Sequence, residues 1–312
     1  MQVRRRCEKT VAARFSSTSC CFTISCCQPG ADGPTPPELQ SDLNEVPQAA
    51  IVSLSGVNPL TCPSIEMAEL WLGGKLIFSN SPESPTTPGK LYEDSALEAT
   101  SGTDYNRIFL YHTNGNSSDH MKFTVLIKNL GCSSATLRVE RKGRAGPTTH
   151  YAYGGKVAFF RWLNSESDEE VEIAPGETVS LDTALDTTLA RETYLMHGIW
   201  DYSFTQPHQV TICALNPDDD PLSVCPGLEV LPRDTHTRGT FPNADKTYAA
   251  VADTIIDTSG DIQQFPIAQQ STGDTYALGT DATDGAEVTN VGNYGILYHI
   301  YLDTVSGDGR NL

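Results

Sequence analysis

Carboxylates gathered in two loops are the residues of this chain whose spacing comes closest to a metal site. Calcium takes several oxygen ligands from a turning backbone, and the loops "NPDDDP" (216–221) and "GDTYALGTDATDG" (273–285) offer them. Neither loop has EF-hand spacing, so solvated acidic turns are the alternative interpretation. We expect no cofactor other than a structural calcium ion, whose candidate ligands are Asp218, Asp219, Asp220, Asp281 and Asp284, with Asp274 nearby.

Dispersed histidines provide a second, weaker metal hypothesis. His112 and His120 flank the loop "TNGNSSD", and His150 could join them in a three-histidine copper or zinc site. The chain has no H-x-H or H-E-x-x-H spacing to support such a site. We therefore expect these histidines to be structural.

Aromatic residues are the candidates for ligand binding. Exposed rings beside a carboxylate would suit a carbohydrate, whereas a tryptophan within a strand is more often part of the core. Glycoside hydrolysis would further need two carboxylates held at a set separation in a cleft, which sequence spacing does not show. The candidate ligand-binding residues are Trp71, Trp162, Trp200, Tyr151 and Tyr153.

Signatures of catalysis are missing from the sequence. There is no G-x-S-x-G nucleophile elbow, and no cysteine lies in a known protease motif. The stretch "YGGK" (153–156) lacks the first glycine and the Ser/Thr of a phosphate-binding loop. The sequence therefore predicts a protein that is not an enzyme.

Nine cysteines divide into five before residue 30 and four in the rest of the chain. Four cysteines allow three pairings, and spacing alone does not choose among them. Cys213 and Cys225 bracket "ALNPDDDPLSV", an expected loop, so they are the first candidates for a disulfide. Buried free thiols are the alternative, and no CxxC pair indicates a zinc knuckle.

The charge of the chain is strongly acidic and uneven. The net charge is −18; residues 1–30 contain five basic residues and one acidic residue (5 − 1 = +4), so the remainder carries −22. Such a body repels nucleic acids and anionic membranes, and we expect neither as a partner. No apolar run is long enough for a transmembrane helix.

The beginning of the chain has the order of a targeting segment. A basic stretch, a neutral run and a spacer with four prolines follow one another, which indicates a secretory leader at 1–28 and a disordered Pro-rich linker at 29–58. Cys26 in "ISC" is a candidate for lipoprotein modification. A disordered leader or a misassigned start codon is the alternative. The expected location is extracellular or on the cell surface.

Period-2 alternation of apolar residues is the main structural signal. It predicts an antiparallel pair within "MKFTVLIKNLGCSSATLRVERKG" (121–143) and a second hairpin around the Pro-Gly of "VEIAPGETVSLD" (171–182). Short helical turns are expected only within 64–72 and 183–192. Further strands are expected at 107–112, 156–162, 194–204, 209–215, 248–256 and 298–302.

Turn signals about every ten residues indicate an all-β, antiparallel β-sandwich of immunoglobulin-like or jelly-roll-like type. We place this sandwich at 59–226 and a second, smaller β-rich region at 227–312. Ile296, Tyr298, Ile300 and Leu302 alternate near the end of the chain. This strand therefore predicts a second domain that is truncated or is completed by pairing with residues 240–290.

Six stretches of the chain carry a resemblance to known proteins: "FSNSPESPTTPGKLYED" (78–94), "FLYHTNG" (109–115), "FTVLIKNLG" (123–131), "HGIWDYSF" (197–204), "RGTF" (238–241) and "GNYGILYHIYL" (292–302). Together they resemble a family of uncharacterised, secreted bacterial β-rich proteins. That family has cyanobacterial members, and its Gram-positive relatives are joined to copper amine oxidase N-terminal-like stalk modules. The resemblance implies export, a β-sandwich body and further chain after the Asn-Tyr-Gly strand, and it carries no catalytic residues.

These observations predict a secreted or cell-surface, noncatalytic bacterial β-sandwich protein with a structural or adhesive role. Its partner would be a component of the cell envelope or a polysaccharide. One alternative is a carbohydrate-binding or carbohydrate-acting module of an extracellular enzyme. Another is a calcium- or copper-binding enzyme domain, which requires clustered His or Asp side chains.

Overall fold

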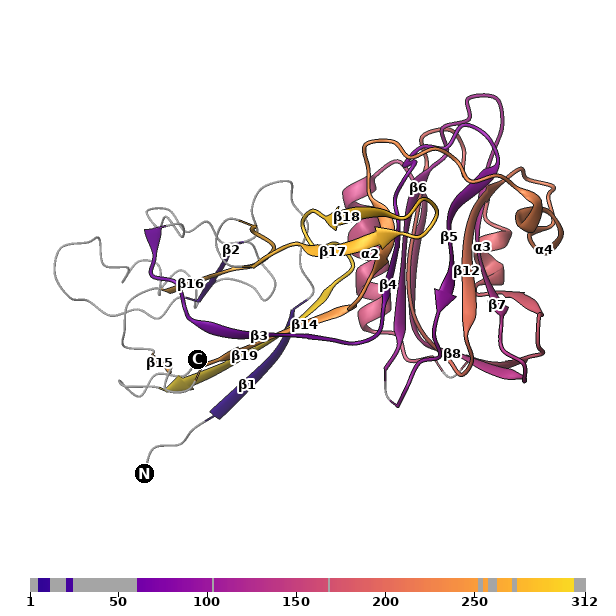
Figure 1. Cartoon of the computed structure of the whole chain (residues 1–312). Coiled ribbons are helices and arrows are strands. Elements are labelled where there is room, and N and C mark those ends of the chain that lie inside the picture. Colours follow the sequence, from indigo (N-terminus) through magenta and orange to yellow (C-terminus); the bar gives the residue numbers. More distant parts are fainter. Residues whose placement is uncertain are drawn as a thin grey trace. The chain divides into compact units, whose positions relative to one another are not determined.

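The protein was analysed as a computed structural model (Figure 1), and the structure describes most of the chain after residue 60. Two short segments before it are described by their backbone. The described residues are 5–11, 21–24, 61–102, 104–167, 169–251, 255–257, 263–270 and 274–305.

The chain forms two compact units. The larger unit contains Trp71–Asp245 and Tyr276–Leu297, and the smaller unit contains Met1–Leu70, Lys246–Thr275 and Tyr298–Leu312. The compact units therefore do not follow the predicted division at residue 227. Segments that are adjacent in the sequence belong to different units, because some strands from the last third of the chain pair with strands of the larger unit.

The larger unit is built from an eight-stranded and a four-stranded sheet, which confirms the predicted all-β, sandwich-like fold (Figure 1). The eight-stranded sheet has the order β18-β17-β13-β4-β6-β11-β8-β9, and the four-stranded sheet has the order β10-β7-β12-β5. The pairing of β4 with β6 is parallel. The strands are β4 (Leu76–Ser79), β5 (Gly89–Leu97), β6 (Asn106–Thr113), β7 (Lys122–Asn129), β8 (Ala135–Thr148), β9 (Glu169–Ile173), β10 (Thr178–Ser180), β11 (Leu195–Phe204), β12 (His208–Leu215), β13 (Arg238–Phe241), β17 (Ala277–Asp281) and β18 (Ala286–Asn290).

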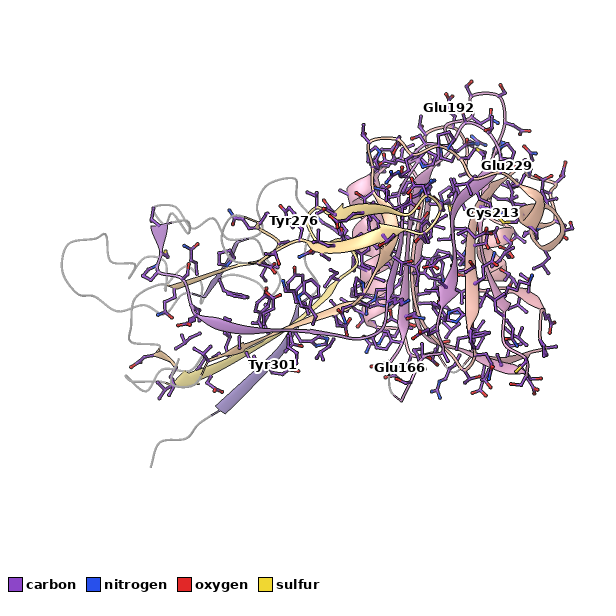
Figure 2. The ribbon with its side chains drawn as sticks, viewed as in Figure 1. Glu166, Glu192, Cys213, Glu229, Tyr276 and Tyr301 are labelled. Atoms are coloured by element: carbon purple, nitrogen blue, oxygen red, sulfur yellow. A yellow bond between two sulfur atoms is a disulfide. The ribbon has the colours of Figure 1, made fainter. Side chains whose placement is uncertain are left out.

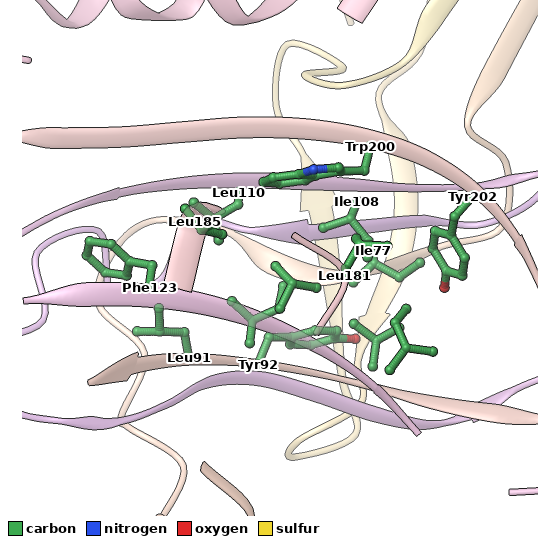
Figure 3. Close-up of a cluster of buried hydrophobic side chains, with 14 of the residues drawn as sticks. Ile77, Leu91, Tyr92, Ile108, Leu110, Phe123, Leu181, Leu185, Trp200 and Tyr202 are labelled. Carbon is green, nitrogen blue, oxygen red and sulfur yellow. The ribbon is translucent and has the colours of Figure 1, made fainter. Parts of the chain in front are cut away.

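The main core lies between these two sheets (Figure 3). Phe123, Val125 and Ile127, which alternate along β7, are all buried in it. Leu137 and Val139 enter the same core from β8 in the other sheet. Alternation therefore predicted the core-facing side chains correctly, because successive residues of a strand point to opposite faces.

The two predicted hairpins are instead crossings between the sheets. β7 pairs with β12 and β10, whereas β8 pairs with β11 and β9. The Pro-Gly turn likewise carries the chain from β9 in one sheet to β10 in the other. The hairpin predictions are wrong because two strands whose apolar faces share one core can lie in opposite sheets as well as pair side by side in the same sheet.

Asn129 holds both crossings together. Its buried side-chain amide donates hydrogen bonds to the carbonyl oxygens of Ser133 (2.9 Å) and Ile173 (3.0 Å), one in each crossing. Its Oδ1 accepts the N–H of Gly131 at 2.8 Å. The backbone of Asn129 also accepts from the N–H of Gly176 at 2.9 Å. One polar side chain thus satisfies backbone groups that the crossings would leave unpaired.

The helices are few and short, apart from one. The helical elements are α2 (Tyr151–Leu163), α3 (Thr183–Asp186), α4 (Pro221–Val224) and the 3₁₀ turn η2 (Cys225–Gly227). The predicted turn within 183–192 is α3, but the predicted turn within 64–72 is wrong, because strand β3 (Met67–Leu72) occupies that segment. Within the described residues, no helix is long and apolar enough to cross a membrane.

Helix α2 replaces the strand predicted at 156–162. It packs on β8 and β11 of the eight-stranded sheet (Figure 1). Its buried residues, Gly154, Ala158 and Trp162, lie four apart and form one helical face. Gly143 on β8 permits this contact, because a Cβ there would lie 2.1 Å from the carbonyl oxygen of Ala158. The strand prediction failed because a short apolar run is compatible with both the two-residue period of a strand and the 3.6-residue period of a helix.

The smaller unit contains a sheet of order β1-β19-β14-β3, with β15 also beside β19, and a separate β2-β16 pair. β19 is an interior strand between β1 and β14, so the expected pairing with residues 240–290 is present. The predicted leader contains β1 and β2; the rest of 1–28, including Cys26, and the linker 29–58 lie outside the described residues. The strands are β1 (Arg5–Val11), β2 (Cys21–Ile24), β3, β14 (Asp245–Ala250), β15 (Ile256–Asp257), β16 (Gln263–Pro266) and β19 (Leu297–Val305).

Candidate functional site

The open side of the sandwich carries a groove between the end strands of the two sheets. β9 ends the eight-stranded sheet and β10 ends the four-stranded sheet, in the part of the chain that the structure describes. A groove of about 440 Å³ lies between them and continues to the start of α3. It is lined by Leu137, Val139, Lys142, Glu169, Glu170, Val171 and residues 179–184.

The floor of the groove is the margin of the main core. Val171 on β9 is opposite Leu137 on β8, so both side chains lie on the core side of the sheet. Val179 on β10 is opposite Ile127, another core residue. Leu137 is buried, but Val171 is 44% exposed because no strand continues the sheet beyond it. The groove therefore presents apolar side chains that solvent reaches.

The rim of the groove is acidic. Of the charged residues that line it, three are acidic (Glu169, Glu170 and Asp182) and one is basic (Lys142). Lys142 makes an ion pair with Glu169. The residues that line the groove therefore carry more negative than positive charge, which favours a ligand that carries positive charge.

Asp182 is the most constrained carboxylate at the groove. Its Oδ1 accepts the N–H groups of Ala184 (3.1 Å) and Leu185 (3.2 Å) and caps α3. Its Oδ2 accepts the indole N–H of Trp200 at 3.2 Å and lies 3.3 Å from Nε of Arg144. At the other end of α3, burial raises the pKa of Asp186, and a hydrogen bond from the Thr124 hydroxyl opposes this effect.

The predicted aromatic residues are not gathered at one site. Trp162 and Trp200 are buried and therefore unavailable to a ligand, and Trp71 is half-buried. Tyr151 and Tyr153 are exposed, by 39% and 68%, at the start of α2. A shallow hollow of about 600 Å³ lies beside them, lined by His150, Tyr151, Ala152 and Tyr153. Of these candidates, the two tyrosines border this hollow.

The first acidic loop uses its carboxylates for local structure. Asp219 accepts the N–H of Asn216 at 2.9 Å, and Asp220 caps α4 by accepting the N–H of Ser223 at 3.1 Å. Asp218 is exposed. Two of the three carboxylates therefore already have backbone donors as partners.

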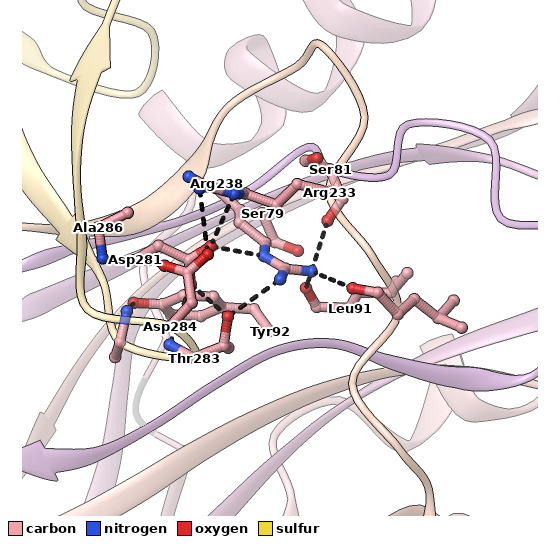
Figure 4. Close-up of polar contacts among 12 residues, drawn as sticks. Ser79, Ser81, Leu91, Tyr92, Arg233, Arg238, Asp281, Thr283, Asp284 and Ala286 are labelled. Atoms are coloured by element: carbon pink, nitrogen blue, oxygen red, sulfur yellow. Dashed lines mark hydrogen bonds and ion pairs between the residues drawn. The ribbon is translucent and has the colours of Figure 1, made fainter.

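The second acidic loop pairs with arginines instead (Figure 4). Buried Asp281 accepts from Nε of Arg238 at 2.9 Å, and Arg233 lies 3.0 Å from Asp284. Arg238 also donates to the carbonyl oxygens of Leu91 and Leu231. Across the described ranges, no group of three or more His, Cys, Asp or Glu residues is placed to hold a metal ion. The structure thus does not assemble the predicted calcium ligands.

The three histidines considered for copper or zinc do not converge either. His112 is buried, where its Nδ1–H donates to the Pro82 carbonyl (2.9 Å) and its Nε2 accepts from the Ser79 hydroxyl (2.8 Å). Burial lowers the pKa of His112 to about 4, so the ring is neutral in the folded protein at neutral pH.

Cys213 and Cys225 are at disulfide distance, with Cα atoms 6.2 Å apart, and Cys213 is labelled on β12 in Figure 2. This is the pairing that the loop between them predicted. It joins β12 to η2 and packs against a small cluster that includes Leu126 and Leu215.

The groove between β9 and β10 was not predicted from the sequence. A signal was present in "EEVEI" (169–173), because glutamates crowded on a short strand are typical of a sheet edge. The identity of the opposing edge, β10, depends on the crossings between the sheets.

Comparison with protein-family models, with curated proteins and with solved structures gives no match. The resemblance to secreted bacterial β-rich proteins therefore stays a prediction that rests on the quoted sequence stretches.

Proposed function

We propose that this chain is a noncatalytic adhesive protein of the cell exterior, and that its larger unit binds an extended, basic segment of a partner protein. The observation that carries this proposal is the groove between β9 and β10. It combines an apolar floor, an acidic rim and two strand edges that end their sheets.

An extended protein segment suits each part of this groove. A strand edge offers backbone N–H and C=O groups to a segment that adds to the sheet. Every second side chain of that segment would face the floor formed by Val171, Val179 and Leu181. Glu170 would then pair with a lysine or arginine of the segment, Glu169 would exchange its partner Lys142 for another, and the charge of both glutamates disfavours acidic segments.

The location outside the cell is supported by two observations. Cys213 and Cys225 are at disulfide distance, and disulfides persist mainly in oxidising compartments. The beginning of the sequence also has the order of a secretory leader, within which β1 and β2 pair with β19 and β16.

Binding of two defined peptides tests the proposal. One peptide alternates valine with lysine and the other alternates valine with glutamate, and fluorescence anisotropy measures their affinities for the full chain. We expect the lysine peptide to bind at least about tenfold more tightly, a difference of about 1.4 kcal/mol. Equal binding of the two peptides, or no binding of either, would contradict the proposal.

A matched pair of variants locates the binding. Val171→Arg places a bulky cation in the groove, whereas Val291→Arg makes the same change at an exposed valine of the larger unit outside it. We expect Val171→Arg to remove most of the lysine-peptide affinity and Val291→Arg to leave it unchanged. Equal effects of the two substitutions would place the binding elsewhere.

Carbohydrate binding is the second candidate, because Tyr151 and Tyr153 are exposed beside the hollow at the start of α2. A glycan array with and without EDTA tests it. Tyr153→Ala should remove the signal, and Phe160→Ala, which removes another exposed ring of α2, should keep it. A blank array would exclude this candidate for the glycans tested, and a loss with EDTA would show that a metal ion takes part.

A further inference from the structure

The smaller unit buries a complete lysine side chain. Lys246 on β14 has no exposed side-chain surface, and a lysine is almost never fully buried unless it is paired. Its Nζ contacts Oδ1 of Asp274, which is also buried and lies in the connection between β16 and β17. An amine and a carboxyl group are therefore in contact inside the protein.

A second carboxylate completes a triad. Oε2 of Glu69, on β3, lies 3.2 Å from Nζ of Lys246. The hydroxyl of Tyr248 bridges the two carboxyl groups, at 2.9 Å from Oε2 of Glu69 and 2.5 Å from Oδ1 of Asp274. Burial raises the pKa of Tyr248, so its hydroxyl keeps its proton at neutral pH. The bridge therefore links Glu69 to the oxygen of Asp274 that faces the lysine.

The other oxygen of Asp274 faces hydrogen-bond donors. Oδ2 accepts from the hydroxyl of Tyr298 at 2.9 Å and from the backbone N–H of Ala268. Two donors directed at one oxygen stabilise negative charge that develops there, as in an oxyanion hole. The rings of Tyr298 and Phe265 pack against Tyr248, and Lys246 and Asp274 are both buried, so water has little access to the reacting pair, whereas Glu69 is partly exposed.

We propose that Lys246 and Asp274 form an intramolecular isopeptide bond, with Glu69 and Tyr248 as positioning and proton-relay residues. This inference goes beyond the proposed adhesive function and does not depend on the groove, because all of its residues belong to the smaller unit.

The reaction is a condensation that balances without an oxidant or a reductant. Proton transfer from the Lys246 ammonium to the carboxyl groups leaves a neutral amine, whose lone pair attacks Cγ of Asp274. The Nζ–Cγ bond forms while Tyr298 and the Ala268 N–H hold the charge on Oδ2. The Cγ–Oδ1 bond then breaks, and Oδ1 leaves as water through Tyr248 and Glu69. Of the three ammonium protons, one stays on the amide and two leave with the water.

The surroundings favour the product over the ion pair. A buried ion pair keeps a large desolvation penalty, whereas an amide is neutral. Fixed contact between the reacting groups replaces a bimolecular encounter. Exclusion of water slows the reverse hydrolysis. The bond would close a covalent loop between β14 and the segment that precedes β17.

Trypsin digestion followed by mass spectrometry tests the bond directly on the full chain after reduction of the disulfide. Lys246 is the only lysine or arginine between Arg238 and Arg310, so an unmodified chain releases peptides 239–246 and 247–310. The isopeptide bond blocks cleavage after Lys246. We expect a single peptide, 239–310, that is lighter than its sequence by one water molecule. Normal cleavage after Lys246, in wild-type protein that was folded before it was denatured for digestion, would overturn the proposal.

Variants separate the roles of the residues. Asp274→Ala should restore cleavage after Lys246, and Asp274→Asn should still form the bond but lose ammonia instead of water. Glu69→Gln should leave most of the chain uncrosslinked, whereas Glu66→Gln, at an exposed glutamate of the same segment, should crosslink fully. Circular dichroism confirms that each variant is folded. Full crosslinking of a folded Glu69→Gln variant would remove Glu69 from the mechanism.

Discussion

Replacing Arg107 with leucine should strongly destabilise the larger unit. Arg107 on β6 is fully buried, and its Nε donates to Oδ1 of Asp201 at 2.7 Å. Its Nη1 donates to the carbonyl oxygens of Ala244 (2.7 Å) and Gly295 (3.0 Å) and lies 3.1 Å from Oδ1 of Asp245. This one side chain thus connects β6 and β11 with two chain connections of the larger unit.

The size of the effect follows from what Arg107→Leu leaves behind. The carboxylate of Asp201 is fully buried and would lose its cationic partner. Breaking a buried ion pair on one side costs about 3–5 kcal/mol, whereas removing both partners is close to neutral. We expect the Arg107→Leu/Asp201→Leu double variant to regain about half of the loss or more. Arg138→Leu, at a half-exposed arginine paired with Glu140, should cost no more than about 1 kcal/mol.

The loss should also depend on pH, with a definite sign. Burial raises the pKa of Asp201, and the charge of Arg107 counteracts that effect. Without Arg107, the pKa of Asp201 in the folded state rises further above its unfolded value. The folded state of Arg107→Leu is then favoured when Asp201 is protonated. The loss of unfolding free energy relative to the wild type is therefore small near the unfolded pKa of about 4 and grows as the pH rises.

Urea denaturation of the wild type and the variants, followed by tryptophan fluorescence, measures these differences. Trp162 is a suitable probe because its ring lies 4.4 Å from the guanidinium carbon of Arg107. A cost of less than about 1 kcal/mol for Arg107→Leu at neutral pH, a value typical of exposed pairs, would contradict this expectation. A double variant that is less stable than Arg107→Leu would contradict it as well.

Three further predictions concern the stability of the same unit. Burial lowers the pKa values of three histidines to about 4, so acidification below their unfolded pKa of about 6.5 should destabilise the fold by up to about 3 kcal/mol each. The three histidines are His112, His197 and His208. A Tm that stays constant as the pH falls from about 6.5 to about 4 would contradict this prediction. Cys213→Ser should lower the free energy of unfolding by about 3 kcal/mol, because the disulfide to Cys225 no longer closes the short loop between them. In urea denaturation, adding a reductant should lower the stability of the wild type by the same amount and leave that of Cys213→Ser unchanged. Gly143→Ala should displace α2 and change the Trp162 fluorescence, whereas Gly155→Ala, where a Cβ meets nothing within 4 Å, should not; equal spectra would refute the contact.

The fold class could be predicted from the sequence because alternation is a local property. The strands expected at 107–112, 194–204 and 209–215 correspond to β6, β11 and β12. The candidate groove could not be predicted in the same way. It exists because β9 and β10 end different sheets, and that depends on which strands neighbour each other.

The sequence by itself indicated which side chains of β7 and β8 face the core, that most of the described segments are extended, and that Cys213 and Cys225 were the first candidates for a disulfide. These features depend on residues within about ten positions of each other, where the geometry of a strand or a short loop leaves few options. Phe123, Val125 and Ile127 are an example, because any strand at that position must place them on one face.

Only the tertiary structure decided which strands lie opposite each other and which distant side chains meet. Asn129 can hold two crossings, and Lys246 can meet both Glu69 and Asp274, only after the chain has returned to the same place from far along the sequence. Local periodicity specifies the face of a strand but leaves its neighbours free. The neighbours are selected by the burial of all the apolar faces together, and that selection is a property of the whole fold.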